Sequence, residues 1–168
     1  FDYTFSSGLQ TRMTGKGSAL VQGTCFLLRG NGLEIYCDGQ TATTLDPSSK
    51  EVIVESLVFD QGDYVNPALL ISSIEKAFDC TSRTSVSYAG KPAVKAVLQP
   101  RKSSAMAKMV LHLSPDGSAL YAASLIMADG SSTDLTFPKF AFAPAGPVAD
   151  FRFDLKSLDN SYFITDLR

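Results

Sequence analysis

The feature that most constrains this chain is an alternation of apolar and other residues with a period of two, interrupted at short intervals by turn-forming residues. Successive side chains of a β-strand point to opposite faces, so this period is typical of half-buried strands rather than of helices. The alternation predicts strands over residues 1–6, 9–15, 18–29, 33–38, 41–46, 51–58, 84–89, 92–99, 106–113, 119–128, 132–137, 149–154 and 161–166.

The turns between these strands indicate an antiparallel meander. Asp46 and Pro47 begin one turn, since Pro presets φ and Asp bonds the local backbone. The stretches 115–117 (PDG) and 129–130 (DG) have the composition of hairpin turns. Residues 139–150 hold two prolines, Pro144 and Pro147, so we expect a long connection there in place of continuous pairing.

One segment departs from the period of two. Asn66 is a typical N-cap and Pro67 suits the first helical position. The apolar residues that follow at helical spacing are Leu70, Ile74, Ala77 and Phe78. This pattern predicts one helix over residues 67–79.

So many strands and one helix in 168 residues predict a mainly β (α+β) fold in a single domain, 1–168. We expect a large curved antiparallel sheet that forms a half-open, incomplete β-barrel, with helix 67–79 as a lid across its mouth. Such a sheet is wider than its own side chains can fill, which leaves room for a ligand. The alternative is that the helix seals a dry core.

Charge and hydropathy argue against nucleic acid as a partner and against a membrane-spanning helix in this sequence. The net charge of −2 gives no long-range attraction for phosphate backbones, so we expect no nucleic acid. No apolar run reaches the roughly 18 to 20 residues of a membrane-spanning helix. The first residues, FDYTF, already alternate like a strand, so we expect the natural protein to begin upstream of Phe1.

The sequence offers little catalytic chemistry. His112 is the only histidine, and it lies between two leucines of a predicted strand. No nucleophile elbow, metal-binding helix, P-loop or dinucleotide fingerprint is present. We therefore expect no enzyme, no cofactor and no metal site. The catalytic alternative is a lipid hydrolase in which His112 lies beside a serine such as Ser124.

The three cysteines allow at most one internal bridge. If the hairpin of residues 23–40 turns about Asn31, Cys25 faces Cys37 across the two strands. A strained disulfide is then one possibility, and three buried free thiols are the other.

Several stretches together resemble a known family. Residues 38–55 (DGQTATTLDPSSKEVIVE), 66–71 (NPALLI), 129–137 (DGSSTDLTF), 151–153 (FRF) and 162–168 (YFITDLR) are similar, in order and spacing, to the LolA-like periplasmic carriers of outer-membrane lipoproteins, of the Bacteroidetes type. The resemblance covers most of the chain from Gly17 onward. Arg29 lacks the proline that follows an arginine in better-known members, and Thr43 stands where they have tryptophan.

The resemblance implies a half-open barrel with a helical lid, an apolar interior that accepts acyl chains, and no catalysis. It also implies a periplasmic location, acylated lipoproteins or lipids as cargo, and an inner-membrane releasing complex and an outer-membrane acceptor as partners. The family's first helix would precede Phe1. We expect a monomer. A sensor with the same fold, which binds envelope proteins or lipids without delivering them, is the alternative function.

The candidate lining of the apolar cavity follows from the alternation of the strands and the spacing of the helix. Its residues are Phe26, Leu28, Ile53, Leu70, Ile74, Phe78, Met109, Leu111, Leu125 and Phe137. Methionines suit such a lining because their side chains adapt to varied chains.

Overall fold

The computed structural model describes residues 1–7, 10–56 and 74–168. The chain divides into two compact units. Unit 1 comprises Phe1–Lys16 and Ser73–Ala143, and unit 2 comprises Gly17–Ser72 and Pro144–Arg168. The expectation of a single domain stays a prediction.

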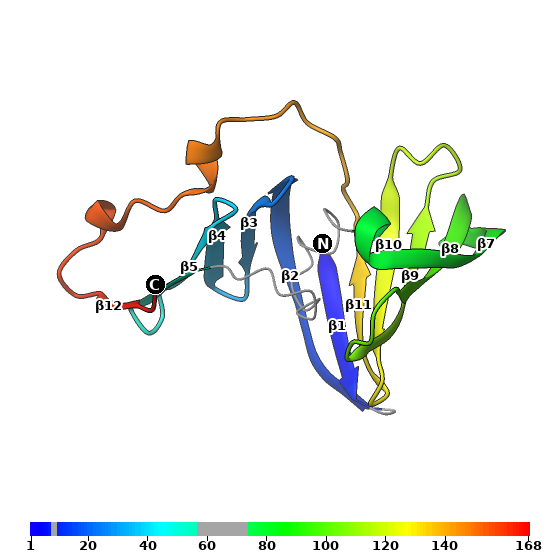
Figure 1. The fold of residues 1–168 in the computed structure, drawn as a ribbon, viewed down its shortest axis with the longest axis horizontal. Helices are drawn as coiled ribbons and strands as arrows, with labels where there is room; N and C mark the ends of the chain where they lie inside the picture. Colours follow the sequence, from blue (N-terminus) through cyan, green and yellow to red (C-terminus); the bar gives the residue numbers. More distant parts are fainter. Residues whose placement is uncertain (8–9, 57–73) are drawn as a thin grey trace. The chain divides into compact units, whose positions relative to one another are not determined.

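Unit 1 is an antiparallel sheet in the order β2-β1-β11-β10-β9-β8-β7 (Figure 1). Only the first part of β2 (Gln10–Gln22) belongs to this unit. The other strands are β1 (Asp2–Ser7), β7 (Phe78–Tyr88), β8 (Lys91–Pro100), β9 (Met106–Leu113), β10 (Leu120–Met127) and β11 (Ser131–Thr136).

Unit 2 continues the pairing from the second part of β2, in the order β2-β3-β4-β5-β6-β12. Its other strands are β3 (Cys25–Gly30), β4 (Leu33–Cys37), β5 (Thr41–Asp46), β6 (Glu51–Ser56) and β12 (Phe163–Asp166). β12 pairs with β6 in parallel, unlike the remaining pairs, which are antiparallel. Two short 3-10 helices, η1 (Val148–Phe151) and η2 (Leu155–Ser157), precede β12.

The expected fold class is confirmed: the described chain is mainly β, and its sheet is not closed. The strand order ends at β7 and at β12. The strands at 41–46 and 106–113 match their predicted bounds, because clear turns flank both. The predicted antiparallel meander is wrong at β12, where the chain returns along β6 in parallel.

The predicted break between strands 9–15 and 18–29 is wrong. β2 runs on through Gly15 and Gly17, which pair with Tyr3 and Gly30 respectively. The chain reverses instead at Gly23, whose φ of +57° is accessible to glycine at little cost. In this stretch, some glycines lie inside an unbroken strand and another lies at a turn. The presence of glycine alone did not distinguish the two cases.

The predicted helix over 67–79 falls largely outside the described residues. Residues 74–77 are helical, but β7 begins at Phe78, so the helical prediction is wrong for its last two positions. The strand predicted at 84–89 accordingly starts earlier. Arg101 explains the boundary, because its backbone N–H donates to the Ala77 carbonyl and its Nε to the Phe78 carbonyl.

The predicted strand at 149–154 is also wrong. Pro147 precedes η1, and Asp150 and Arg152 donate backbone N–H groups to the carbonyls three residues earlier. Of the apolar residues that suggested a strand, Phe153 packs against the core of Leu45, Val52 and Val54, together with Leu155 and Leu158 from beyond the predicted strand. Apolar residues alternate along this segment because one of its sides is buried, although the segment pairs with no strand.

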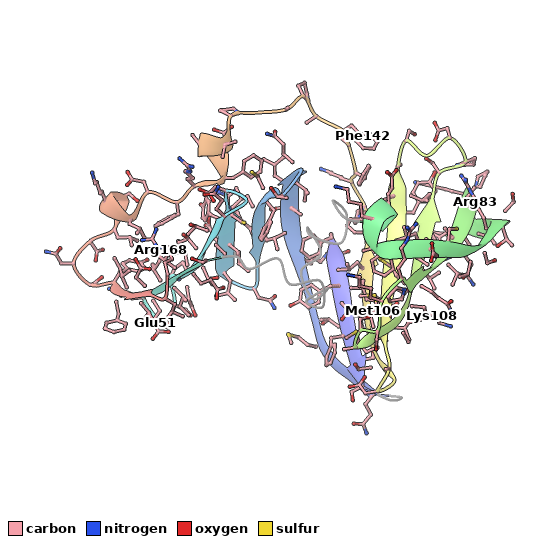
Figure 2. The ribbon with its side chains drawn as sticks, in the orientation of Figure 1. Glu51, Arg83, Met106, Lys108, Phe142 and Arg168 are labelled. Carbon is pink, nitrogen blue, oxygen red and sulfur yellow. The ribbon has the colours of Figure 1, made fainter. Side chains whose placement is uncertain are left out.

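The proline-rich connection was predicted correctly. Residues 138–147 form no helix or strand. Phe142 lies on this connection and is 76% exposed (Figure 2).

Candidate functional site

One face of unit 1 is apolar across most of its strands. Direct cross-strand partners share a face, and the register aligns Leu98, Met109 and Leu125 in one row. A parallel row holds Ala96, Leu111, Ala123 and Leu135. These residues are buried. We call this surface the Met109 face.

The Met109 face becomes exposed towards β2. The first row continues from Leu125 through Thr133 and Phe5 to Met13. Phe5 is half-buried, and Met13 is 51% exposed. An apolar row therefore reaches solvent at one side of unit 1, which is the kind of surface that marks a binding site.

Three predicted lining residues, Met109, Leu111 and Leu125, lie together on this face. Phe78 pairs with Pro100, which places it on the same side of β8 as Leu98. Phe137 directly follows β11, and its ring lies 6.5 Å from that of Phe1. Ile74 is half-buried in the helical residues 74–77, and Leu70 lies outside the described residues.

The remaining predicted lining residues, Phe26, Leu28 and Ile53, lie in unit 2. The register places all three on one face of its sheet, here called the Phe26 face. Phe26 is 1% exposed and packs with Cys37, Val21, Leu28 and Ile35, whereas Ile53 is 38% exposed. The predicted residues thus form two groups, one in each unit, and their role as a ligand lining stays a prediction.

The proposed Cys25–Cys37 bridge is absent. The hairpin turns on two residues, Asn31 and Gly32, which both have positive φ. This type of turn shifts the register by one, so that Cys37 pairs with Phe26. Cys25 and Cys37 are buried free thiols. Burial raises the pKa of the Cys37 thiol, which keeps it protonated and unreactive.

The alternative of three buried free thiols is wrong for one of the cysteines. Cys80 is exposed, so the three thiols are not all buried.

Arg29 lies on the face of unit 2 opposite Leu28, because neighbouring residues of a strand alternate. Its Nε is 3.0 Å from Glu34 Oε2, and its Nη2 donates to the Tyr36 hydroxyl at 3.3 Å. Tyr36 in turn donates to Glu34 Oε2 at 2.6 Å, and this bond is the main reason that the pKa of Glu34 is lowered. Arg29 therefore organises the far side of the sheet from Phe26.

That far side, the Val54 face, carries a pocket of about 270 Å³ that sequence reasoning missed. Residues of β4, β5, β6 and the β4–β5 turn line one side, and the segment before β12 lines the other together with Arg168, which follows β12. The lining consists of Tyr36, Asp38, Thr41, Thr43, Val54, Phe151, Arg152, Phe153, Leu155 and Arg168. No sequence signal connects residues 36–54 with 151–168, since only the packing of the C-terminal segment brings them together.

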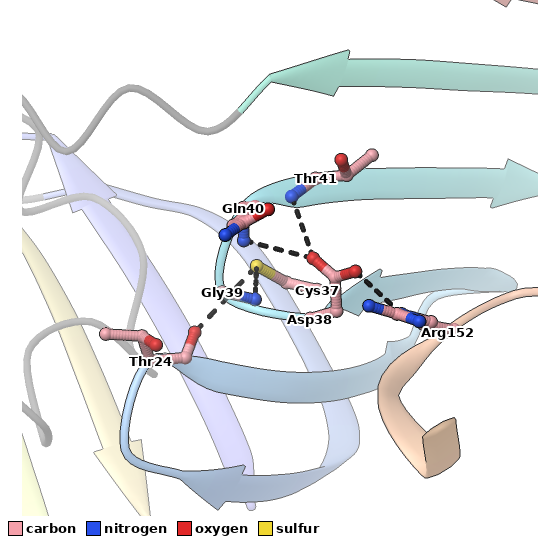
Figure 3. Close-up of polar contacts among 7 residues, drawn as sticks. All are labelled: Thr24, Cys37, Asp38, Gly39, Gln40, Thr41 and Arg152. Atoms are coloured by element: carbon pink, nitrogen blue, oxygen red, sulfur yellow. Dashed lines mark hydrogen bonds and ion pairs between the residues drawn. The ribbon is translucent and has the colours of Figure 1, made fainter. Parts of the chain in front are cut away.

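Asp38 lines this pocket, and its polar contacts are drawn in Figure 3. Its Oδ1 accepts the backbone N–H groups of Gln40 and Thr41 at 3.0 and 2.9 Å, and its Oδ2 accepts Arg152 Nε at 2.8 Å. Burial by itself would raise the pKa of Asp38, but the two backbone donors and Arg152 outweigh it and lower the pKa. The carboxylate stays ionised and ties the C-terminal segment to the β4–β5 turn.

The turn itself requires glycine at position 39. Gly39 has a φ of +92°, and a Cβ there would lie 2.6 Å from Thr24 Oγ1. Figure 3 also shows the Gly39 backbone N–H donating to Cys37 Sγ, at 3.4 Å.

The hydrolase alternative finds no support in the geometry. Ser124 donates to Asp134 Oδ1 at 2.5 Å, not to His112. The His112 ring stacks on Tyr88 at 4.6 Å, and its Nδ1 is buried with no hydrogen-bond partner in the described chain. Burial, with a smaller contribution from Lys95, lowers the pKa of His112. The residues that would have to cooperate are thus engaged elsewhere.

Residues 1–7, 10–56 and 74–168 lack two further features. Within them, no helix has the length and apolar character to span a membrane. The same residues contain no cluster of three or more His, Cys, Asp or Glu side chains able to hold a metal ion.

Solved structures include several with a similar fold, whereas no family model and no curated protein matches the chain. A domain from Vibrio parahaemolyticus assigned to outer-membrane lipoprotein sorting is 14% identical, with a TM-score of 0.40, over 89% of this chain and 86% of that one. A DUF1329 family protein from Desulfovibrio piger is 11% identical, with a TM-score of 0.46, over 90% and 87%.

MucB, in the Pseudomonas aeruginosa MucA/MucB complex, is 17% identical with a TM-score of 0.40, over 91% of this chain and 54% of that one. The chain thus spans about half the length of MucB. At these identities the likeness concerns the fold and transfers no function. The chain is thus similar in fold to a lipoprotein-sorting domain, a DUF1329 protein and MucB, and the LolA-like assignment rests on the sequence motifs.

Proposed function

We propose that the chain is a non-catalytic periplasmic carrier that binds the acyl chains of lipoproteins and moves them towards the outer membrane. One observation supports this function above the others: the apolar row of the Met109 face, which runs from buried Met109 to Met13 at 51% exposure. An acyl chain laid along the exposed end of this row, from Phe5 to Met13, exchanges water for apolar contact.

The expected energetics suit reversible transfer. A chain that buries about ten methylenes gains roughly 8 kcal/mol relative to water, at about 0.8 kcal/mol for each CH₂. A bilayer offers a similar gain, so the hydrocarbon contributions nearly cancel between donor and carrier. The direction of transfer is then set by the partners, the releasing complex and the outer-membrane acceptor, rather than by the acyl chain.

The experiment compares binding of a synthetic acylated lipopeptide with that of the same peptide lacking its acyl chains. The test variant is Met13→Glu, which places a charge at the exposed end of the Met109 face. Leu20→Glu is the matched control, because Leu20 lies on the same strand with a similar exposure of 46% but belongs to unit 2, outside the Met109 face.

We expect the lipopeptide alone to bind, Met13→Glu to weaken its binding at least tenfold, and Leu20→Glu to leave it unchanged. Equal losses in both variants, or equal binding of both peptides, would contradict an acyl site on this face. In cells, deletion of the gene should leave lipoproteins at the inner membrane. A stress response without lipoprotein retention would instead indicate the sensor.

A further inference from the structure

The pocket on the Val54 face has the composition of a ligand site distinct from the acyl surface. Its volume of about 270 Å³ is close to the lower end of ligand pockets, roughly 300–1,000 Å³. A group the size of one capped amino acid suits this space, whereas a whole lipid does not. Tyr36, Thr43 and Val54 point away from Phe26 and Leu28, since their positions in the register alternate.

The apolar part of the pocket contains three aromatic side chains, Tyr36, Phe151 and Phe153, beside Val54 and Leu155. Val54 is 1% exposed and Phe151 2%. The rings of Tyr36 and Phe153 lie 5.2 Å apart in a tilted arrangement, and the Tyr36 hydroxyl is held by Glu34 and Arg29. Such a preformed wall suits a flat or branched apolar group, because little side-chain entropy is lost on binding.

The polar groups of the pocket that remain free to bond a ligand are mainly hydrogen-bond donors. Arg152 uses Nε on Asp38, and its two terminal amino groups have no partner among the described residues. The hydroxyl of Thr43, a residue that is 7% exposed, likewise makes no side-chain hydrogen bond within the described chain. Asp38 already accepts three hydrogen bonds, so it offers little to a ligand.

We propose that this pocket binds a carboxylate carried on an aromatic or branched apolar group, such as the carboxyl end of a peptide with an apolar last residue. The carboxylate lies against the terminal amino groups of Arg152 and the Thr43 hydroxyl, and the apolar group lies against Tyr36, Phe153 and Val54. A planar guanidinium favours a carboxylate because it can form two parallel hydrogen bonds with it.

The experiment titrates ¹⁵N-labelled protein with N-acetyl-phenylalanine and, separately, with N-acetyl-phenylalaninamide, which lacks the negative charge. We expect the acid to shift the backbone signals of Thr41, Thr43 and Arg152, and the amide to bind at least tenfold more weakly. Equal binding of acid and amide, or shifts confined to other residues, would overturn the proposal.

Two variants and a control assign the contacts. Arg152→Gln should weaken binding of the acid about tenfold or more and leave binding of the amide unchanged, as expected for loss of a charge-assisted hydrogen bond. Lys156→Gln removes an exposed cation of the same segment that does not line the pocket, and should have no effect. If the Lys156 variant loses as much affinity as the Arg152 variant, the attraction is only long-range and the site is disproved.

Thr43→Val tests the second donor without emptying the space, and a severalfold loss is expected. This variant also separates a lost contact from misfolding. Arg152→Gln removes the hydrogen bond from Arg152 Nε to Asp38, whereas Thr43→Val leaves that bond intact. Wild-type affinity in both variants would exclude the site. Neither outcome bears on lipopeptide binding at the Met109 face, so the two proposals fail separately.

Discussion

The two units use their sheets differently. In unit 1 the Met109 face is apolar, and the opposite face carries polar groups such as Lys108, Ser124 and Asp134. In unit 2 both faces hold buried residues: Phe26 and Cys37 on one, and Val52 and Val54 on the other. The second face exists as core only because the segment before β12 covers it.

The difference shows what a covering segment changes. Where the chain itself covers a sheet face, side chains from distant parts of the sequence converge, and a pocket with charged groups at its rim can form. Where an apolar row ends at an exposed position, as at Met13, the apolar surface faces solvent, and the proposed acyl-chain site uses this part.

The largest expected effect tests the core of unit 2. Phe26→Ala removes a side chain that is 1% exposed, so we expect a loss of about 3–5 kcal/mol in the free energy of unfolding, measured by chemical denaturation. Amide hydrogen exchange in the variant should accelerate more in β3–β5 than in β9 and β10. Equal acceleration of exchange in both sets of strands would show that the two units unfold together as one cooperative domain.

The next effect concerns the tie between the C-terminal segment and the sheet. Asp38→Asn should cost about 1–3 kcal/mol at neutral pH, since the hydrogen bonds to a charged acceptor are weakened. Because the pKa of Asp38 is lowered in the folded state, its stabilisation is present above the unfolded pKa of about 3.9 and is lost as the pH falls through the folded value.

The variant and wild type should therefore converge in strong acid, as seen in denaturation midpoints across the pH range. A difference that is constant with pH would show that the charge of Asp38 does not hold the segment.

A smaller effect is expected in unit 1. The pKa of His112 is lowered in the folded state, so the unfolded chain takes up a proton more readily. Stability should fall as the pH drops from about 7 to about 5, below the unfolded pKa of about 6.5. His112→Phe keeps the stacking on Tyr88 and should flatten this dependence; an unchanged slope would assign it to other groups.

The smallest effect compares a buried with an exposed phenylalanine of the same unit. Phe163 is 68% exposed on β12, so Phe163→Ser should change stability by no more than about 0.5 kcal/mol in the same denaturation assay. A loss of unfolding free energy close to that of Phe26→Ala would show that Phe163 is covered in solution. The edge formed by β12 would then be an interface.

The sequence by itself determined the fold class and most strand positions. The period of two and the turns at Asp46, Asp116 and Asp129 are local signals, and each of these aspartates bonds the backbone or a serine of its own turn. The same alternation placed Met109, Leu111 and Leu125 on one face. These results need only neighbouring residues, which is why they could be predicted.

Tertiary structure alone decided the rest. The register of the Asn31–Gly32 hairpin is the exception, because an Asn-Gly pair is a local signal for the two-residue turn that separates Cys25 from Cys37. Phe151 and Phe153 alternate like a strand, but Phe151 lies in η1 and Phe153 packs against the core of unit 2 outside any strand. The pocket of Arg152 and Thr43 joins positions more than a hundred residues apart. Periodicity reports which side of a segment is buried, and it carries no information about which distant segment buries it.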